Sequence, residues 1–312
     1  MFFNHRKSLQ PSLTEVPAHA AGMGSVARTQ DRRLYQRGRT YQKISMILTY
    51  AVLIIMALII LLPFAWLLSG SLKTIGQYYA SPIQWIPNPF KWSNYVEAFT
   101  VYGFARYVLN SIFLAVWEMV ASTIVSSLVA FGFARFRFPG RMVLFLIMLS
   151  TLMLPAQVLT IPLYITFKNL GWIDTFLPLM VPQLFGSAYN IFLFRQFFMG
   201  LPRELDDAAR IDGCGYLRIW WYIILPQSRP VFVVVAIFAF LTSWRDAWKP
   251  LIYLNSQDMR TIPLGLLYFT NGYSSVYPQM MAATVVALAA PVLLYALGQR
   301  YIDRGIAIAE IK

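Results

Sequence analysis

The sequence predicts an all-α membrane protein with six transmembrane helices. Hydrophobic residues make up 58% of the chain, charged residues make up 12%, and the mean hydropathy is +0.56. Soluble domains carry about 25% charged residues. Apolar stretches long enough to cross a hydrocarbon layer of about 30 Å recur six times. They lie near residues 44–69, 107–134, 142–166, 176–199, 230–254 and 279–299.

Residues 1–43 differ from the rest of the chain and predict a flexible basic cytoplasmic tail before a transmembrane domain at 44–312. The tail is rich in Arg and Lys against only Glu15 and Asp31, and it lacks apolar periodicity. It is no secretory signal, because the first apolar run starts late and no small-residue cleavage site follows. Binding of nucleic acid has little support there.

The distribution of charge predicts which side of the membrane each loop occupies. An N-terminus inside the cell places most of the 26 Lys and Arg residues on the cytoplasmic side, as the positive-inside rule requires. The prediction is therefore N-in and C-in, with the loop at 201–229 in the cytoplasm. The net charge of +13 then reflects topology and anionic lipid.

Small residues at intervals of four mark the second span. Such a ridge lets another helix backbone approach closely, so we expect a helix–helix contact, although small residues also occur by chance in transmembrane helices. The ridge consists of Ser122, Ser126, Ala130 and Ala134.

Prolines interrupt the later spans and free backbone carbonyls for other partners. Three amides near these breaks suit a cavity wall, and an interhelical hydrogen bond is the alternative for each. The prolines are Pro155, Pro162, Pro178, Pro182 and Pro291, and the amides are Gln157, Gln183 and Asn190.

The fifth span has a polar centre, which makes it the candidate for the translocation path or gate. A charged residue at mid-membrane costs roughly 2.5–3.5 kcal/mol on insertion scales, so such residues normally face water or a partner. The alternative is a structural ion pair between Asp246 and a neighbouring cation. Glu118 in the second span is expected to be an interhelical partner. The candidates in the fifth span are Trp244, Arg245, Asp246 and Lys249.

The loop at 201–229 predicts a short polar helix followed by a sharp turn. Pro202 suits a first helical turn, acidic residues follow at the positive N-terminal end, and Arg210 suits the last turn. Leu205, Ala208 and Ala209 recur at i, i+3 and i+4 and form one slim apolar face. Two glycines, Gly213 and Gly215, permit the reversal that ends the helix.

No catalytic constellation can be assembled from the sequence. Cys214 is the single cysteine, the two histidines lie in the tail, and no G-x-x-x-x-G-K-[ST] loop is present. The chain is therefore predicted to be no enzyme, with no catalytic residue, no metal site and no cofactor of its own. Its energy source would be another chain or a gradient.

The loop resembles the EAA loop of ABC-importer permeases. Asp207–Ala209, Gly213 and Ile224–Pro226 match the motif, with Asp207 in place of the commoner glutamate. The resemblance implies coupling helices that seat in a groove of a separate cytoplasmic ATPase, which would hold ATP and Mg. An amphipathic helix on the membrane surface is the alternative. The implied coupling residues are Glu204, Asp207, Ala208, Ala209, Asp212, Gly213, Leu225 and Pro226.

From residue 60 onward the chain resembles the carbohydrate-uptake permeases related to the smaller permease subunit of the maltose/maltodextrin system. Arg245 stands where this family often has asparagine. The upstream matches are Leu62–Trp66, Ser71–Lys73, Asn94–Tyr95, Asn110–Ser111, Ala134–Gly140, Pro155–Gln157, Pro162–Tyr164 and Arg195–Phe198. The downstream matches are Pro202–Leu205, Asp212–Gly213, Leu225–Pro226, Pro230, Ser243–Trp244, Pro263–Gly265 and Gln299–Tyr301.

The resemblance implies an importer permease in a bacterial or archaeal cytoplasmic (inner) membrane. Its partners would be a second permease subunit in a heterodimer, two ABC ATPase subunits and an extracytoplasmic solute-binding protein. The aromatic-rich segment 70–106 would dock that protein, or else anchor at the interface. An acidic sugar, a polyol, a glycerol-phosphate-like compound and a neutral oligosaccharide all remain open as substrates. The rival functions are a gradient-driven secondary transporter and a non-transporting scaffold.

Overall fold

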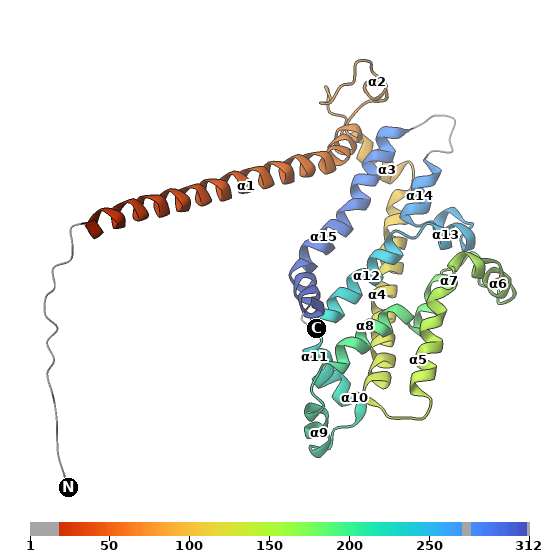
Figure 1. The fold of residues 1–312 in the computed structure, drawn as a ribbon. Helices are drawn as coiled ribbons and strands as arrows, with labels where there is room; N and C mark the ends of the chain where they lie inside the picture. Colours follow the sequence, from red (N-terminus) through yellow and green to blue (C-terminus); the bar gives the residue numbers. More distant parts are fainter. Residues whose placement is uncertain (1–18, 270–275, 311–312) are drawn as a thin grey trace, which may run out of the picture. The chain divides into compact units, whose positions relative to one another are not determined.

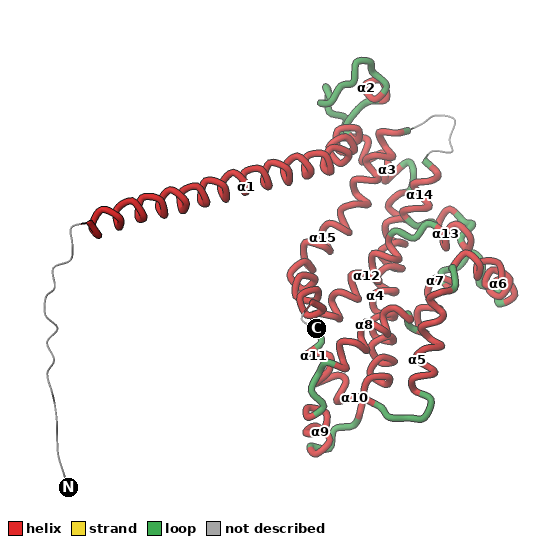
Figure 2. Tube along the Cα trace, viewed as in Figure 1, coloured by secondary structure: helices red, strands yellow, loops and turns green. Residues whose placement is uncertain are grey.

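The computed structural model describes the backbone of residues 19–269 and 276–310, and the side chains of residues 45–269 and 276–299. Every regular element in these ranges is a helix (Figure 2). The longer helices are α1 (His19–Ser71), α3 (Ser93–Thr100), α4 (Phe104–Arg135), α5 (Arg141–Ser150), α6 (Ala156–Asn169), α8 (Ala188–Met199), α9 (Glu204–Ile211), α12 (Arg229–Trp244), α14 (Ile262–Tyr268) and α15 (Tyr277–Glu310).

Short helical segments connect the longer ones. They are α2 (Ile75–Tyr78), α7 (Leu177–Met180), α10 (Tyr216–Ile219), α11 (Leu225–Gln227), α13 (Trp248–Tyr253), three 3₁₀ turns at Thr151–Met153, Val181–Phe185 and Gln257–Met259, and a π-helical turn at Trp220–Ile224.

The contacts divide the chain into two units, residues 1–64 and 65–312. In the first unit, residues 1–18 lie outside the described residues, and the backbone from His19 belongs to α1, so the stretch 19–43 that was expected as flexible tail is helical. All side chains from Ser45 to Phe64 are exposed. An exposed apolar helix of this length suits lipid or another subunit.

The second unit is built around α4, which packs most extensively against α12 and α8. Figure 1 shows α9, α10 and the α4–α5 turn at one end of this unit, and α3 and α14 at the other. The apolar core has two clusters. One contains Phe194, Phe198 and Trp220 near α9, and the other contains Phe104 and Trp244.

The small-residue ridge of α4 lies at a helix contact, as predicted. All four of its residues are buried. The Ser187 backbone N–H donates to Ser126 Oγ at 3.0 Å, and Asn190 Nδ2 donates to Ser122 Oγ at 3.1 Å. These bonds join the start of α8 to the middle of α4, so the ridge holds the two helices at close range.

The described residues contain four helices long and apolar enough to cross a membrane, or up to six if each of two bent pairs is one span. The span expected at 142–166 is one such pair, because α6 is bent by 97° from the helix before it. Pro155 has no N–H to donate, and it holds Leu154 in an extended conformation. The third span is therefore broken and not straight.

The span expected at 230–254 was wrong at its C-terminal end. Helix α12 ends at Trp244, and a separate helix, α13, begins at Trp248. Asp246 Oδ1 accepts the backbone N–H groups of Trp248 and Lys249 at 3.0 and 3.2 Å. An acidic side chain that binds the backbone in this way competes with helix continuation. The preceding 216–227 segment instead pairs with α12 across a bend of 87°.

A buried polar cluster orders the chain just after α1. Asn94 Nδ2 donates to the carbonyls of Ser71 and Lys73, each at 2.8 Å. Lys73 Nζ is buried 4.0 Å from the centroid of the Trp66 ring. Burial lowers the pKa of Lys73. The aromatic segment 70–106 is thus folded around specific contacts, although Trp85 and Trp92 stay exposed and available to a partner.

Gly265 lies so close to Tyr107 that a larger residue at this position is expected to lower stability. A Cβ at Gly265 would lie 2.3 Å from Cδ2 of the buried Tyr107 ring, where α14 meets α4. We expect Gly265→Ala to lower the free energy of unfolding by about 1–3 kcal/mol, because the added methyl group would overpack the core. Thermal unfolding in detergent measures it. Gly76→Ala is the matched control, since a Cβ there meets no atom within 4 Å, and equal effects of the two substitutions would contradict this account.

Candidate functional site

Helix α9 is the short polar helix predicted in the loop at 201–229. Its first turn carries Glu204, Asp206 and Asp207, and its last turn carries Arg210, as the sequence predicts. The negative charges lie at the positive end of the helix dipole. Pro202 precedes the helix and does not form its first turn, because α9 starts at Glu204.

The turn after α9 needs a glycine at one position only. Gly213 has φ of +79°, a left-handed conformation that favours glycine. The N–H of Gly213 donates to Arg210 O, and the N–H of Cys214 donates to Ala209 O. Gly215 has φ of −72°, which any residue adopts, so the expectation that it also permits the reversal was wrong.

The expected apolar face of α9 is divided between core and surface. Ala209 is buried against the cluster of Ile219 and Trp220, whereas Ala208 is exposed and Leu205 is half-buried. The exposed side of α9 therefore combines a small residue with carboxylates. Its exposed members are Glu204, Asp207, Ala208, Arg210 and Ile211, and the exposed Asp212 follows at the C-cap.

An ion pair that the sequence did not reveal anchors α9 to α4. Arg135 Nε lies 2.9 Å from Asp206 Oδ2, and the two side chains are 2% and 6% exposed. Arg135 Nη1 also donates to Leu201 O at 3.1 Å. Burial raises the pKa of Asp206, and the neighbouring Arg135 offsets part of that rise. The spacing of Asp206 three residues before Ala209, on the same helix face, was the available signal.

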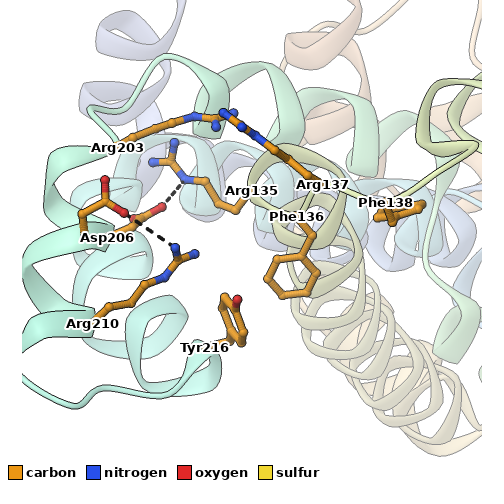
Figure 3. A pocket seen from close by; sticks show the side chains of 9 residues that line it. Arg135, Phe136, Arg137, Phe138, Arg203, Asp206, Arg210 and Tyr216 are labelled. Carbon is orange, nitrogen blue, oxygen red and sulfur yellow. Dashed lines mark ion pairs between the residues drawn. The ribbon is translucent and has the colours of Figure 1, made fainter.

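A groove of about 650 Å³ opens between α9 and the end of α4. Figure 3 shows Arg135 and Arg210 directed toward the carboxylates of α9, and Arg203 and Arg137 directed toward each other. Asp207 forms an exposed ion pair with Arg210 at 3.6 Å. The groove is lined by Arg135, Phe136, Arg137, Phe138, Arg203, Asp206, Asp207, Arg210 and Tyr216.

The C-terminal part of the loop, Tyr216–Gln227, is bent by 87° from α12. After α10, a π-helical turn spans Trp220–Ile224, and α11 begins at Leu225 with Pro226 in its first turn. Ser228 is fully buried at the bend that leads into α12. Leu225 and Pro226 are both half-buried at this elbow. The loop is therefore joined to α4 through the ion pair and to α12 through the Leu225–Pro226 bend.

The candidate path residues are not gathered into one site. Asp246 and Lys249, paired at 3.1 Å, line a small cavity together with Glu118. Its volume of about 20 Å³ suits one water and is too small for a sugar. The alternative of a structural ion pair is therefore the one that the structure contains.

The remaining candidates lie elsewhere. Trp244 is buried and donates from Nε1 to Ala287 O at 3.1 Å, and Asn190 forms the interhelical bond to Ser122. Arg245 and Gln157 are exposed, and Gln183 is half-buried. Trp244 and Asn190 thus make helix-to-helix hydrogen bonds, and the cavity wall shared by the set stays a prediction.

Broken apolar helices with a charged helix and turn at one end are typical of a multi-pass membrane protein. The chain belongs to the family of binding-protein-dependent transport system inner membrane components, whose family model matches residues 122–308. It is thus a transport permease component, and such components work with partner subunits.

Individual relatives agree with this family. The diacetylchitobiose uptake system permease protein NgcG of Streptomyces coelicolor is 31% identical over 82% of this chain and 85% of its own length. The sn-glycerol-3-phosphate transport system permease protein UgpE of Yersinia pestis is 34% identical over 85% of this chain and 96% of its own. A solved bacterial ABC transporter involved in import of the acidic polysaccharide alginate contains a chain with a similar fold, with a TM-score of 0.73 and 22% identity over 83% of this chain and 96% of that chain.

Proposed function

We propose that this chain is the membrane-spanning permease subunit of an ATP-driven importer for a sugar, an oligosaccharide or a related polyhydroxylated solute. The names of similar permeases support this substrate class, since they include diacetylchitobiose, arabinooligosaccharides and sn-glycerol-3-phosphate. The membrane would be the cytoplasmic (inner) membrane of a bacterium or archaeon. A second permease subunit would complete the pore, and an extracytoplasmic solute-binding protein would deliver the substrate.

The observation that carries the proposal is the way α9 is held. Its outer side exposes Asp207, Ala208 and Asp212, while its inner side is tied to α4 by the buried Arg135–Asp206 pair. A helix exposed on one side and anchored on the other is suited to receive force from a docked protein. That protein would be one of two cytoplasmic ABC ATPase subunits, which would bind the ATP and Mg.

In this mechanism ATPase closure displaces α9, and the permease converts that displacement into a change of access. The ion pair passes the displacement to α4, and the elbow at Leu225–Pro226 passes it to α12. Helices α4 and α12 pack against each other more extensively than any other pair. A displacement passed to both helices would therefore act at this shared contact, and a shift of one helix against the other would switch the path between outward and inward access.

The test compares two glycines of the same turn. Gly213→Val forces a left-handed conformation that costs roughly 1–2 kcal/mol in a non-glycine residue, and Gly215→Val does not. Neither added Cβ meets an atom within 4 Å. In proteoliposomes with the ATPase and the loaded binding protein, we expect Gly213→Val to reduce ATP-dependent uptake roughly tenfold, the factor that corresponds to 1.4 kcal/mol.

Membrane insertion is expected to be normal for both variants, and Gly215→Val is expected to transport like the parent. Equal uptake by the two variants would contradict the coupling role of the loop. Uptake that needs a proton gradient and no ATP would replace the proposal with a secondary transporter. ATP hydrolysis by the purified chain alone would refute the division of labour between subunits.

A further inference from the structure

The groove beside α9 carries more positive charge than its own carboxylates neutralise. Asp206 is paired with Arg135, and Asp207 with Arg210. Arg137 and Arg203 also line the groove, and among the described residues neither has a carboxylate oxygen within the 4.0 Å of an ion pair. The groove therefore has an excess of two cationic side chains.

The arrangement of these guanidinium groups is suited to an anion between them. Arg137 and Arg203 are directed toward each other across the groove, as Figure 3 shows. Two like charges that face each other repel unless an anion or solvent separates them. In addition, Arg135 Nη2 is buried without a hydrogen-bond acceptor and Asp206 Oδ1 without a donor, and buried polar groups usually have a partner. A carboxylate accepts from several guanidinium donors at once.

The walls of the groove are held by aromatic contacts. The rings of Phe136 and Tyr216 meet edge to face with centroids 4.7 Å apart, and the Arg210 guanidinium lies 5.2 Å from the centroid of Tyr216. Next to these residues in the chain, Ile211 and Leu217 are 86% and 72% exposed. A basic groove formed by a loop that also exposes apolar side chains fits a protein surface better than a free ion.

The charges of α9 decide between a protein and a membrane as the occupant. The exposed charges of residues 203–212 are mixed, with three carboxylates (Glu204, Asp207 and Asp212) and two cations (Arg203 and Arg210). An anionic lipid surface would attract the two arginines but repel the three carboxylates. A folded protein can present an acidic side chain to the groove and basic or neutral groups to α9. The groove is basic and the neighbouring helix α9 carries exposed carboxylates, so this surface favours a polypeptide that has both signs of charge.

We propose that the groove receives an acidic side chain of the ATPase subunit, held between Arg137 and Arg203, as a second contact beside the one made by α9. This inference depends on the proposed function. It assigns the arginine groove to assembly and leaves the transmission of force to α9 and its turn. Complementary charges at the rim of an interface increase the rate and specificity of association, and salt screens them.

The experiment reverses charge inside and outside the groove. The double variant Arg137→Glu/Arg203→Glu is compared with Arg218→Glu/Arg229→Glu, which changes the same charge at exposed residues that do not line the groove. The complete transporter is placed in nanodiscs of neutral phosphatidylcholine, with or without anionic phosphatidylglycerol. The ATPase is removed with high salt, and the Kd for its rebinding to the permease is then measured.

We expect the groove variant to bind the ATPase roughly tenfold more weakly at low salt in both lipid mixtures, with a smaller difference at high salt because of screening. The control variant should bind like the parent. A photo-reactive residue at position 137 should cross-link to an acidic segment of the ATPase. Replacement of the cross-linked acidic residue of the ATPase with Lys should restore binding to the groove variant.

Other results overturn the inference. An effect found only with anionic lipid assigns the groove to a headgroup. If the groove variant binds the ATPase as tightly as the parent, the groove makes no contact with the ATPase. The proposed function would still hold in that case, provided that Gly213→Val shows reduced ATP-dependent uptake. A parent transporter that has no ATPase attached in any condition defeats the proposed function itself.

Discussion

Replacement of Arg135 with methionine is expected to lower the free energy of unfolding of this protein by about 3–5 kcal/mol, because it leaves a buried carboxylate without its cation. The two side chains are 2.9 Å apart and almost fully buried. The same site also joins α9 to α4, so the loss should loosen the docking helix. Thermal unfolding in detergent and ATP-dependent uptake measure the two consequences.

Arg210→Met is the matched control, because it breaks an exposed Arg–Asp pair of the same loop. Exposed pairs contribute about 0–1 kcal/mol. The double variant Arg135→Met/Asp206→Leu should recover most of the lost stability, since an apolar replacement of a buried pair is often neutral. If Arg135→Met unfolds at the same temperature as Arg210→Met, the buried pair is not the anchor.

The pH dependence of Arg135→Met follows from the pKa of Asp206. Burial already raises that pKa from its ordinary value of 3.8, and Arg135 offsets part of the rise. Without Arg135 the pKa in the folded state rises further, so the folded protein binds a proton more readily than the unfolded chain. The stability deficit of the variant should therefore shrink as the pH falls from 8 to 5. A deficit that grows over this range would contradict the assignment.

The second large effect is expected at Trp244. Its ring is buried, stacks on Phe240 with centroids 5.4 Å apart, and donates to Ala287 O at 3.1 Å, which joins α12 to α15. Trp244→Ala should lower the free energy of unfolding by about 3–5 kcal/mol, as for other large-to-small core substitutions. Trp244→Phe should cost less because it keeps the stack.

The matched control is Trp248→Ala, since the Trp248 side chain is 51% exposed. Uptake per folded molecule separates a structural role from a role in the path. If Trp244 is a packing residue, the Trp244→Phe variant keeps its substrate preference once the amount of folded protein is normalised. An altered preference with unchanged stability would return Trp244 to the substrate path.

The helical class and the helix-turn structure of the 201–229 loop were predictable because both depend on local chemistry. Helix α9 forms from acidic residues in its first turn and Arg210 in its last, and Gly213 reverses the chain after it. These signals lie within one short segment, so no distant contact is needed to interpret them. The small residues of the α4 ridge likewise predicted a close helix contact, and they are buried.

The polar centre of the fifth span could not be interpreted in the same way. The prediction assumed one continuous helix over 230–254, which placed Arg245, Asp246 and Lys249 together at the polar centre of one span. Asp246 instead binds the backbone of α13 and ends that continuity. Whether a side chain caps a helix or lies inside one depends on competition between nearby backbone conformations, and periodicity alone does not resolve it.

The sequence by itself determined that this protein crosses a membrane, that its third span is broken at Pro155, and that a charged helix and turn occur at 204–213, because composition, missing N–H donors and helix dipoles act locally. The predicted interruptions at Pro162 and Pro291 were wrong, because these prolines lie inside α6 and α15. Only the tertiary structure decided that Asp206 pairs with Arg135 and that Trp244 belongs to the core. Asp206 and Arg135 are 71 positions apart in the chain. Such contacts form when packing removes both partners from water, and that choice depends on how whole helices are arranged.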